Sequence, residues 1–162
     1  LNRPSDANAL LEMLQSHRRP VGFQVFAEVV HSRLRHPGYL GDMPHTWVGA
    51  GYINAVRSIF AYEEEDKLVL AAGVPAEWLL VGVTVKDLPT QFGDISYTLV
   101  RKDGSIHFAV EGKAQPPGGF RVELPSDYAG WTVTVNGKVK TGKSALTLDR
   151  LPATVLLAPP AP

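Results

Sequence analysis

The sequence of 162 residues has no cysteine, no net charge and no long apolar run. The absence of cysteine excludes disulfides, thiolate metal sites and a cysteine nucleophile, but it does not exclude an oxidising compartment. Sixteen Lys and Arg balance sixteen Asp and Glu. Because nucleic acids and anionic membranes are bound by surfaces with a basic excess, we expect neither as a partner. No apolar stretch approaches the roughly 18 residues of a membrane span.

What the sequence does contain is enough apolar material for a core and many turn residues. Hydrophobic residues make up 44% of the chain, beside 15 glycines and 13 prolines. This composition is typical of short strands joined by tight turns. The chain begins with Leu1 and not with methionine, so we expect it to be part of a longer protein.

The first 65 residues have helical periodicity. Three helices are predicted because apolar residues recur at intervals of three and four. Ser5 or Asp6 can cap the first helix and Asp42 or Thr46 the third. The predicted helices span Ala7–His17, Gly22–Arg33 and Trp47–Tyr62.

From Lys67 onward the pattern changes to alternation and short apolar runs, which indicates strands. Asp103-Gly104 and Asn136-Gly137 each follow such a run, and both pairs favour the tight turn of a β-hairpin. Many short strands with Gly and Pro turns favour an antiparallel sandwich. The predicted strands are Leu68–Ala72, Trp78–Val85, Ile95–Arg101, Ile106–Glu111, Phe120–Leu124, Trp131–Asn136, Ala145–Leu148 and Thr154–Leu157.

These patterns predict an α+β fold, in which about three N-terminal helices precede an antiparallel β-sandwich of about eight strands. The change of composition predicts two domains, residues 1–65 and 66–162. The acidic run Glu63–Asp66 lies at this change, and a solvated turn is the simplest interpretation of it.

A nucleotide site and a metal site both have little support. Gly137–Ser144 satisfies the P-loop formula letter by letter, but a P-loop leads into a helix whose N-terminus holds phosphate. Here the following residues alternate like a strand, so the segment indicates a Lys-rich hairpin. No two histidines have the i, i+4 spacing that places two imidazoles on one helix face. We therefore expect no cofactor and no metal.

One stretch, Phe23–Tyr62, concentrates side chains that suit a sugar site. Carboxylates among aromatic rings and histidines supply a stacking face, forked acceptors for hydroxyls and a group for proton transfer. Asp42, His45 and Trp47 are the candidate substrate-binding residues. The alternative is structural, with Asp42 as a helix cap and Trp47 in the core. The full set is Glu28, His31, His36, Tyr39, Asp42, His45, Trp47 and Tyr52.

Several segments together resemble the C-terminal portion of bacterial glycoside hydrolases of the six-hairpin, (α/α)₆-barrel type, the α-L-rhamnosidase-like group among them. In those enzymes the last barrel helices run directly into a C-terminal β-sandwich. The segments that carry the resemblance are Arg19–Val29, Gly41–Gly49, Leu70–Leu79, Leu88–Tyr97, Gly119–Pro125 and Gly130–Gly137.

The resemblance implies a role for Glu28. In the rhamnosidase-like group a glutamate before a His-bearing loop and the last barrel helix acts as general base, and Glu28, His45 and Trp47–Tyr62 follow in that order. The aromatic residue that the group has directly before its glutamate is Ala27 here, with Phe26 one place earlier. As a base, Glu28 would deprotonate a water, and an acid from another segment would protonate the leaving oxygen.

The resemblance therefore implies the C-terminal portion of a carbohydrate-active enzyme, with carbohydrate and the remaining barrel as partners. It favours a secreted or periplasmic location, and we expect the 162 residues alone to be inactive. The alternative is a stand-alone carbohydrate-binding or interaction module whose sandwich presents aromatic rings to a ligand. A purely structural sandwich is a third interpretation. The candidate aromatic residues are Trp78, Tyr97, Phe108 and Trp131.

Overall fold

A computed structural model describes residues 4–18, 22–31, 33, 36, 41–124, 128, 130–140 and 146–160. The chain forms two compact units, Leu1–Ser58 and Ile59–Pro162. It has the expected α+β class, and the described residues form three helices and two sheets of four and six strands. Within those residues, each helix is too short or too polar to cross a lipid bilayer.

The first unit contains two of the three predicted helices. Helix α1 spans Pro4–Ser16 and α2 spans Thr46–Phe60, so both are confirmed to within a few residues. At the end of α1 the Met13 carbonyl accepts the His17 N–H at 3.1 Å and also the Ser16 hydroxyl at 2.7 Å. At the start of α2 the His45 carbonyl accepts the Gly49 N–H at 3.1 Å. His45, and not Asp42 or Thr46, therefore has the N-cap position.

The predicted helix Gly22–Arg33 is wrong. Its described residues form bends and irregular backbone around an isolated bridge at Val30. The His45 N–H donates to the Phe26 carbonyl at 2.7 Å, and the Glu28 N–H donates to the Asp42 carbonyl at 3.0 Å. These backbone groups thus pair across a loop with the segment before α2. The helical spacing of apolar residues did not reveal this because periodicity reports side chains and not backbone partners.

In the second unit, one sheet has four strands in the order β1-β2-β6-β9. Strands β2 and β6 are parallel, and the other pairs are antiparallel. Strand β1 was not predicted. Its last residues, Glu63 and Glu64, belong to the acidic run that was expected to be a solvated turn, and only Glu65 and Asp66 form that turn. The bounds are β1 Ala61–Glu64, β2 Lys67–Leu70, β6 Phe120–Val122 and β9 Leu146–Leu148.

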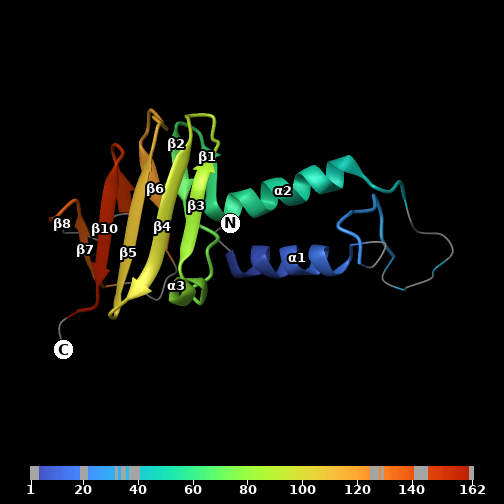
Figure 1. The fold of residues 1–162 in the computed structure, drawn as a ribbon, viewed down its shortest axis with the longest axis horizontal. Coiled ribbons are helices and arrows are strands. Elements are labelled where there is room, and N and C mark those ends of the chain that lie inside the picture. Colours follow the sequence, from blue (N-terminus) through green and yellow to red (C-terminus); the bar gives the residue numbers. More distant parts are fainter. Residues whose placement is uncertain are drawn as a thin grey trace. The chain divides into compact units, whose positions relative to one another are not determined.

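The other sheet has six antiparallel strands in the order β3-β4-β5-β10-β7-β8 (Figure 1). The last strand, β10, lies between β5 and β7 and pairs with both. The bounds are β3 Val83–Leu88, β4 Ile95–Lys102, β5 Ser105–Gly112, β7 Thr132–Val135, β8 Lys138–Lys140 and β10 Ala153–Ala158.

Alternation along the strands places the core of the sandwich between the two sheets. In β4, β5 and β10 every second residue is buried and the residues between them are more exposed. This is the pattern of antiparallel sheets that have one face on a core. The largest fully buried side chains of the chain are Phe108, Phe120, Leu68, Leu70, Leu79, Ile95, Leu99, Ile106 and Val69.

Both predicted hairpin turns are confirmed. Asp103 and Gly104 have φ angles of 51° and 77°, and Asn136 and Gly137 have 48° and 78°. Two successive positive φ angles define the tight turn that matches the twist of paired strands. Asn136 also accepts the Thr154 N–H on its side-chain oxygen at 2.8 Å, which ties this turn to β10.

The predicted strand Trp78–Val85 is wrong in its first half. Residues Trp78–Val81 form the short helix α3, and β3 begins at Val83. The helical turn starts after Pro75, whose carbonyl accepts the Trp78 N–H at 3.1 Å. It ends at Gly82, where φ is 95°, a conformation that glycine adopts at little cost.

Candidate functional site

The candidate residues of the first unit are brought together by the loop pairing of residues 26–28 with residues 42–45. The two backbone hydrogen bonds between Phe26 and His45 and between Glu28 and Asp42 form this short ladder. Three of the four predicted site residues, Glu28, Asp42 and His45, therefore share one local structure, although the helix expected to hold Glu28 is absent. Tyr39 lies outside the described residues.

Glu28 lies directly against Gly41. A β-carbon at position 41 would be 2.7 Å from both the Cβ and the Oε2 of Glu28. Any other residue at position 41 would push the carboxylate away, because real atoms do not approach so closely. Glycine at position 41 thus leaves the room that the Glu28 side chain occupies, and only the glycine-rich loop in the sequence pointed to it.

Glu28 lines a pocket of about 290 Å³ in the first unit. Its wall is mostly apolar, with Glu28 and His17 as the two ionisable residues. His17 was not among the predicted site residues, although it follows Met13 and Leu14 at helical spacing. The lining residues are Met13, Leu14, His17, Phe26, Ala27, Glu28, Val30 and Val48.

The other predicted residues lie outside this lining. Asp42 is exposed, and Trp47 is 84% exposed at the start of α2. The His45 ring contacts Trp47 edge-on, with ring centroids 6.2 Å apart. Its buried Nδ1 has no hydrogen-bond partner among the described residues. Because it is so exposed, Trp47 is not a core residue, and its ring is open for stacking. The roles of Glu28, Asp42, His45 and Trp47 stay predictions.

Glycoside hydrolysis uses two carboxyl groups on either side of the scissile bond. Glu28 is the one carboxylate in the described pocket lining. This arrangement can supply a base or an anionic contact, and a general acid would have to come from elsewhere, as the sequence also predicts. No group of three or more potential metal ligands occurs among the described residues.

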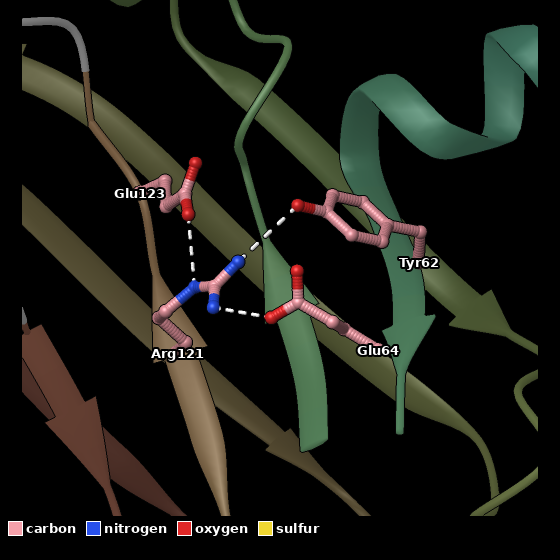
Figure 2. Close-up of polar contacts among 4 residues, drawn as sticks. All are labelled: Tyr62, Glu64, Arg121 and Glu123. Atoms are coloured by element: carbon pink, nitrogen blue, oxygen red, sulfur yellow. Dashed lines mark hydrogen bonds and ion pairs between the residues drawn. The ribbon is translucent and has the colours of Figure 1, made fainter. Parts of the chain in front are cut away.

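A second polar cluster lies on the four-stranded sheet (Figure 2). Arg121 on β6 donates through Nη1 to Glu64 on β1, and its Nη2 donates to the Tyr62 hydroxyl at 3.3 Å. Its Nε forms an ion pair with Glu123 at 2.8 Å, without hydrogen-bond alignment. The hydrogen bond from Arg121 lowers the pKa of Glu64.

This cluster connects β1 to β6 across the strand between them. Tyr62, Val69 and Arg121 are neighbours in the register of the sheet, and Val69 is fully buried. The guanidinium is shared between two carboxylates and a phenol, and its Nε contributes an ion pair but no hydrogen bond. We assign it to the stability of the fold.

The aromatic residues predicted to face a ligand on the sandwich divide into two groups. Tyr97 and Phe108 are 2% and 1% exposed, so these two candidates face the core and cannot contact a ligand. They alternate with exposed residues and point into the core. Trp78 is 40% exposed. Trp131 is half-buried, with Arg101 6.0 Å above its ring and Tyr128 4.9 Å away between ring centroids.

The P-loop-like segment contains β8, an exposed strand of the hairpin. The residues after it, 141–145, lie outside the described residues, and the chain continues as strand β9. The described part of this segment has no helix N-terminus, which a phosphate site of this type requires.

Comparison with known proteins gives one distant likeness. No protein-family model matches the chain, and no curated protein matches it. Among solved structures, a family 127 β-L-arabinofuranosidase from Geobacillus stearothermophilus T6 is similar at 14% identity, with a TM-score of 0.40. The aligned region covers 71% of this chain and 19% of that enzyme, so the match spans about a fifth of the enzyme's length.

Proposed function

We propose that this chain is the C-terminal portion of an enzyme that hydrolyses glycosidic bonds. Residues 1–65 would supply closing helices of an α-barrel, and residues 66–162 an accessory sandwich. Its partners would be carbohydrate and the remaining barrel. The proposal rests on the resemblance of the motifs and on the order of helices before sandwich.

The observation that carries the proposal is the position of Glu28. Its backbone N–H donates to the Asp42 carbonyl, its side chain fits against Gly41, and it lines a pocket. A general base needs this kind of defined position, with room beside it for the water that it deprotonates. His45 and the open ring of Trp47 lie on the adjoining segment, where they would contact the sugar.

The test is an assay of the complete gene product against a panel of aryl glycosides. We expect turnover by the complete enzyme and none by the 162 residues alone. Glu28→Gln in the complete enzyme should lower kcat by a factor of about 10²–10⁴ and change KM little, as expected for loss of a general base. Glu12→Gln, on the exposed side of α1, is the matched control and should keep full activity.

Three outcomes would contradict different parts of the proposal. Unchanged kcat in Glu28→Gln would remove Glu28 from the mechanism and leave the enzyme class standing. Absence of turnover on every glycoside, or turnover by the 162 residues alone, would contradict the class or the incompleteness of the chain.

A second function, carbohydrate binding by the sandwich, is favoured by one observation. Trp131 has an aromatic neighbour, Tyr128, and a cationic neighbour, Arg101, a combination that suits stacking of a sugar ring. Oligosaccharide binding that is lost in Trp131→Ala, with folding intact by circular dichroism, would support this module. Binding that instead depends on Glu28 and Asp42 would place the site in the first unit.

A further inference from the structure

The pocket of the first unit combines an apolar wall with two ionisable residues. Six of its eight lining residues are apolar, and they come from α1, from residues 26–30 and from α2. Its volume of about 290 Å³ is near the lower limit of small-molecule sites. A dry apolar cavity of about 150 Å³ already holds benzene. The space therefore suits one six-membered ring with a short substituent.

The charged group at this pocket is an acceptor. Glu28 contributes a carboxylate to the lining, and no described cation forms an ion pair with it. The Nδ1 of His17 lies 2.8 Å from the Met13 carbonyl oxygen and 3.1 Å from the Ser16 hydroxyl, so this nitrogen is engaged at the end of α1. A ligand held by the carboxylate must donate a hydrogen bond.

We propose that this pocket binds a small organic amine, with its apolar ring against the α1 and α2 side chains and its ammonium group at Glu28. The apolar wall would leave most hydroxyls of a whole sugar ring without partners, at a cost in free energy. A single donor group on an apolar body avoids that cost, and a positive charge makes its hydrogen bond to the carboxylate charge-assisted. This inference does not depend on the proposed glycosidase function.

The test compares three probes that share a ring and differ in charge, namely benzylamine, benzyl alcohol and benzoate. Binding to the 162-residue protein is followed near pH 7 by methyl NMR shifts of Leu14, Val30 and Val48. We expect benzylamine to bind about three- to tenfold more tightly than benzyl alcohol, and benzoate to bind most weakly. Added salt should weaken the binding of the amine but not of the alcohol.

Two variants distinguish the contribution of the Glu28 carboxylate to binding from that of the apolar cavity. Glu28→Gln should lower the affinity for benzylamine to that for benzyl alcohol and leave the alcohol affinity unchanged. Glu12→Gln is the matched control, because Glu12 is an exposed carboxylate of α1 outside the pocket lining. Val30→Phe should fill the cavity and weaken all three probes. The helicity by circular dichroism and the methyl signals of Leu10 and Ile53, which lie in the first unit outside the pocket lining, report whether each variant remains folded.

Equal affinities for the three probes, or an unchanged amine preference in Glu28→Gln, would overturn the inference. So would methyl shifts that fall outside the pocket lining. Because binding is measured without turnover, loss of the glycosidase proposal would leave this result intact, and the reverse also holds.

Discussion

Tyr97 carries a hydroxyl group into the core of the sandwich. Its side chain is 2% exposed, and the hydroxyl donates to the Phe60 carbonyl at 3.0 Å. Burial raises the pKa of this phenol above its usual value near 10, because the charged form would lose its hydration. One residue thus links β4 to the end of α2 and makes the fold sensitive to alkali.

Tyr97→Phe should lower the free energy of unfolding by about 1 kcal/mol at neutral pH, the usual net value of a hydrogen bond. Urea denaturation measures the change. Tyr62→Phe is the comparison, since its hydroxyl accepts a longer bond from Arg121 on a half-buried surface, and it should cost less. Equal losses in the two variants would contradict the assignment of Tyr97 as the more important hydroxyl.

The same residue predicts a pH dependence. The unfolded phenol ionises near pH 10, whereas the folded one stays protonated, so the contribution of Tyr97 is complete below pH 10 and is lost as pH rises above it. The free energy of unfolding should fall above pH 10 in the wild-type chain and fall less steeply in Tyr97→Phe. Identical slopes in the two proteins would refute the shifted pKa.

At the scale of elements, β8 is an edge strand with two lysines. Lys138 and Lys140 are exposed and flank Val139, which is 62% exposed. An unpaired edge can pair with another chain, and lysines on an edge oppose this. The two lysines of β8 therefore have a structural explanation.

The double variant Lys138→Thr and Lys140→Thr should keep the fold and associate at concentrations at which the wild-type chain stays monomeric. Light scattering during size-exclusion chromatography measures this. Lys113→Thr, an exposed loop position, removes a charge away from that edge and should have no effect. If Lys113→Thr associates to the same extent, the association results from the change in net charge and not from the exposed edge of β8.

Prediction from the sequence succeeded where one local signal decided the structure. Asp103-Gly104 and Asn136-Gly137 require positive φ angles and formed turns, and α2 followed its apolar stripe. Prediction failed at Gly22–Arg33, where hydrogen bonds to a distant segment replace the helix. It also could not place Glu28 against Gly41, because that contact depends on the same distant pairing.

At the scale of the whole molecule, the core is distributed unequally between the two units. Among the described residues, every buried apolar side chain except Ala27 belongs to Ile59–Pro162. The first unit has two helices of 13 and 15 residues, lengths at which an isolated helix is only marginally stable in water. Stability should therefore reside mainly in the second unit.

Residues 59–162 expressed alone should fold and unfold cooperatively in urea, with methyl NMR signals close to those of the longer chain. Residues 1–58 alone should show low helicity by circular dichroism, because their helices would need additional apolar surface to pack against. A molten spectrum for 59–162, or a cooperative transition for 1–58, would contradict this division of stability.

The place of β10 has a consequence for synthesis on the ribosome. Residues 153–158 follow every other strand of the six-stranded sheet in the sequence, yet they lie at its centre. Until they emerge from the ribosome, β5 and β7 have no common neighbour and each leaves one edge unpaired. A nascent chain that stalls before residue 153 would thus be a substrate for chaperones, because the sheet can close only after β10 has been translated.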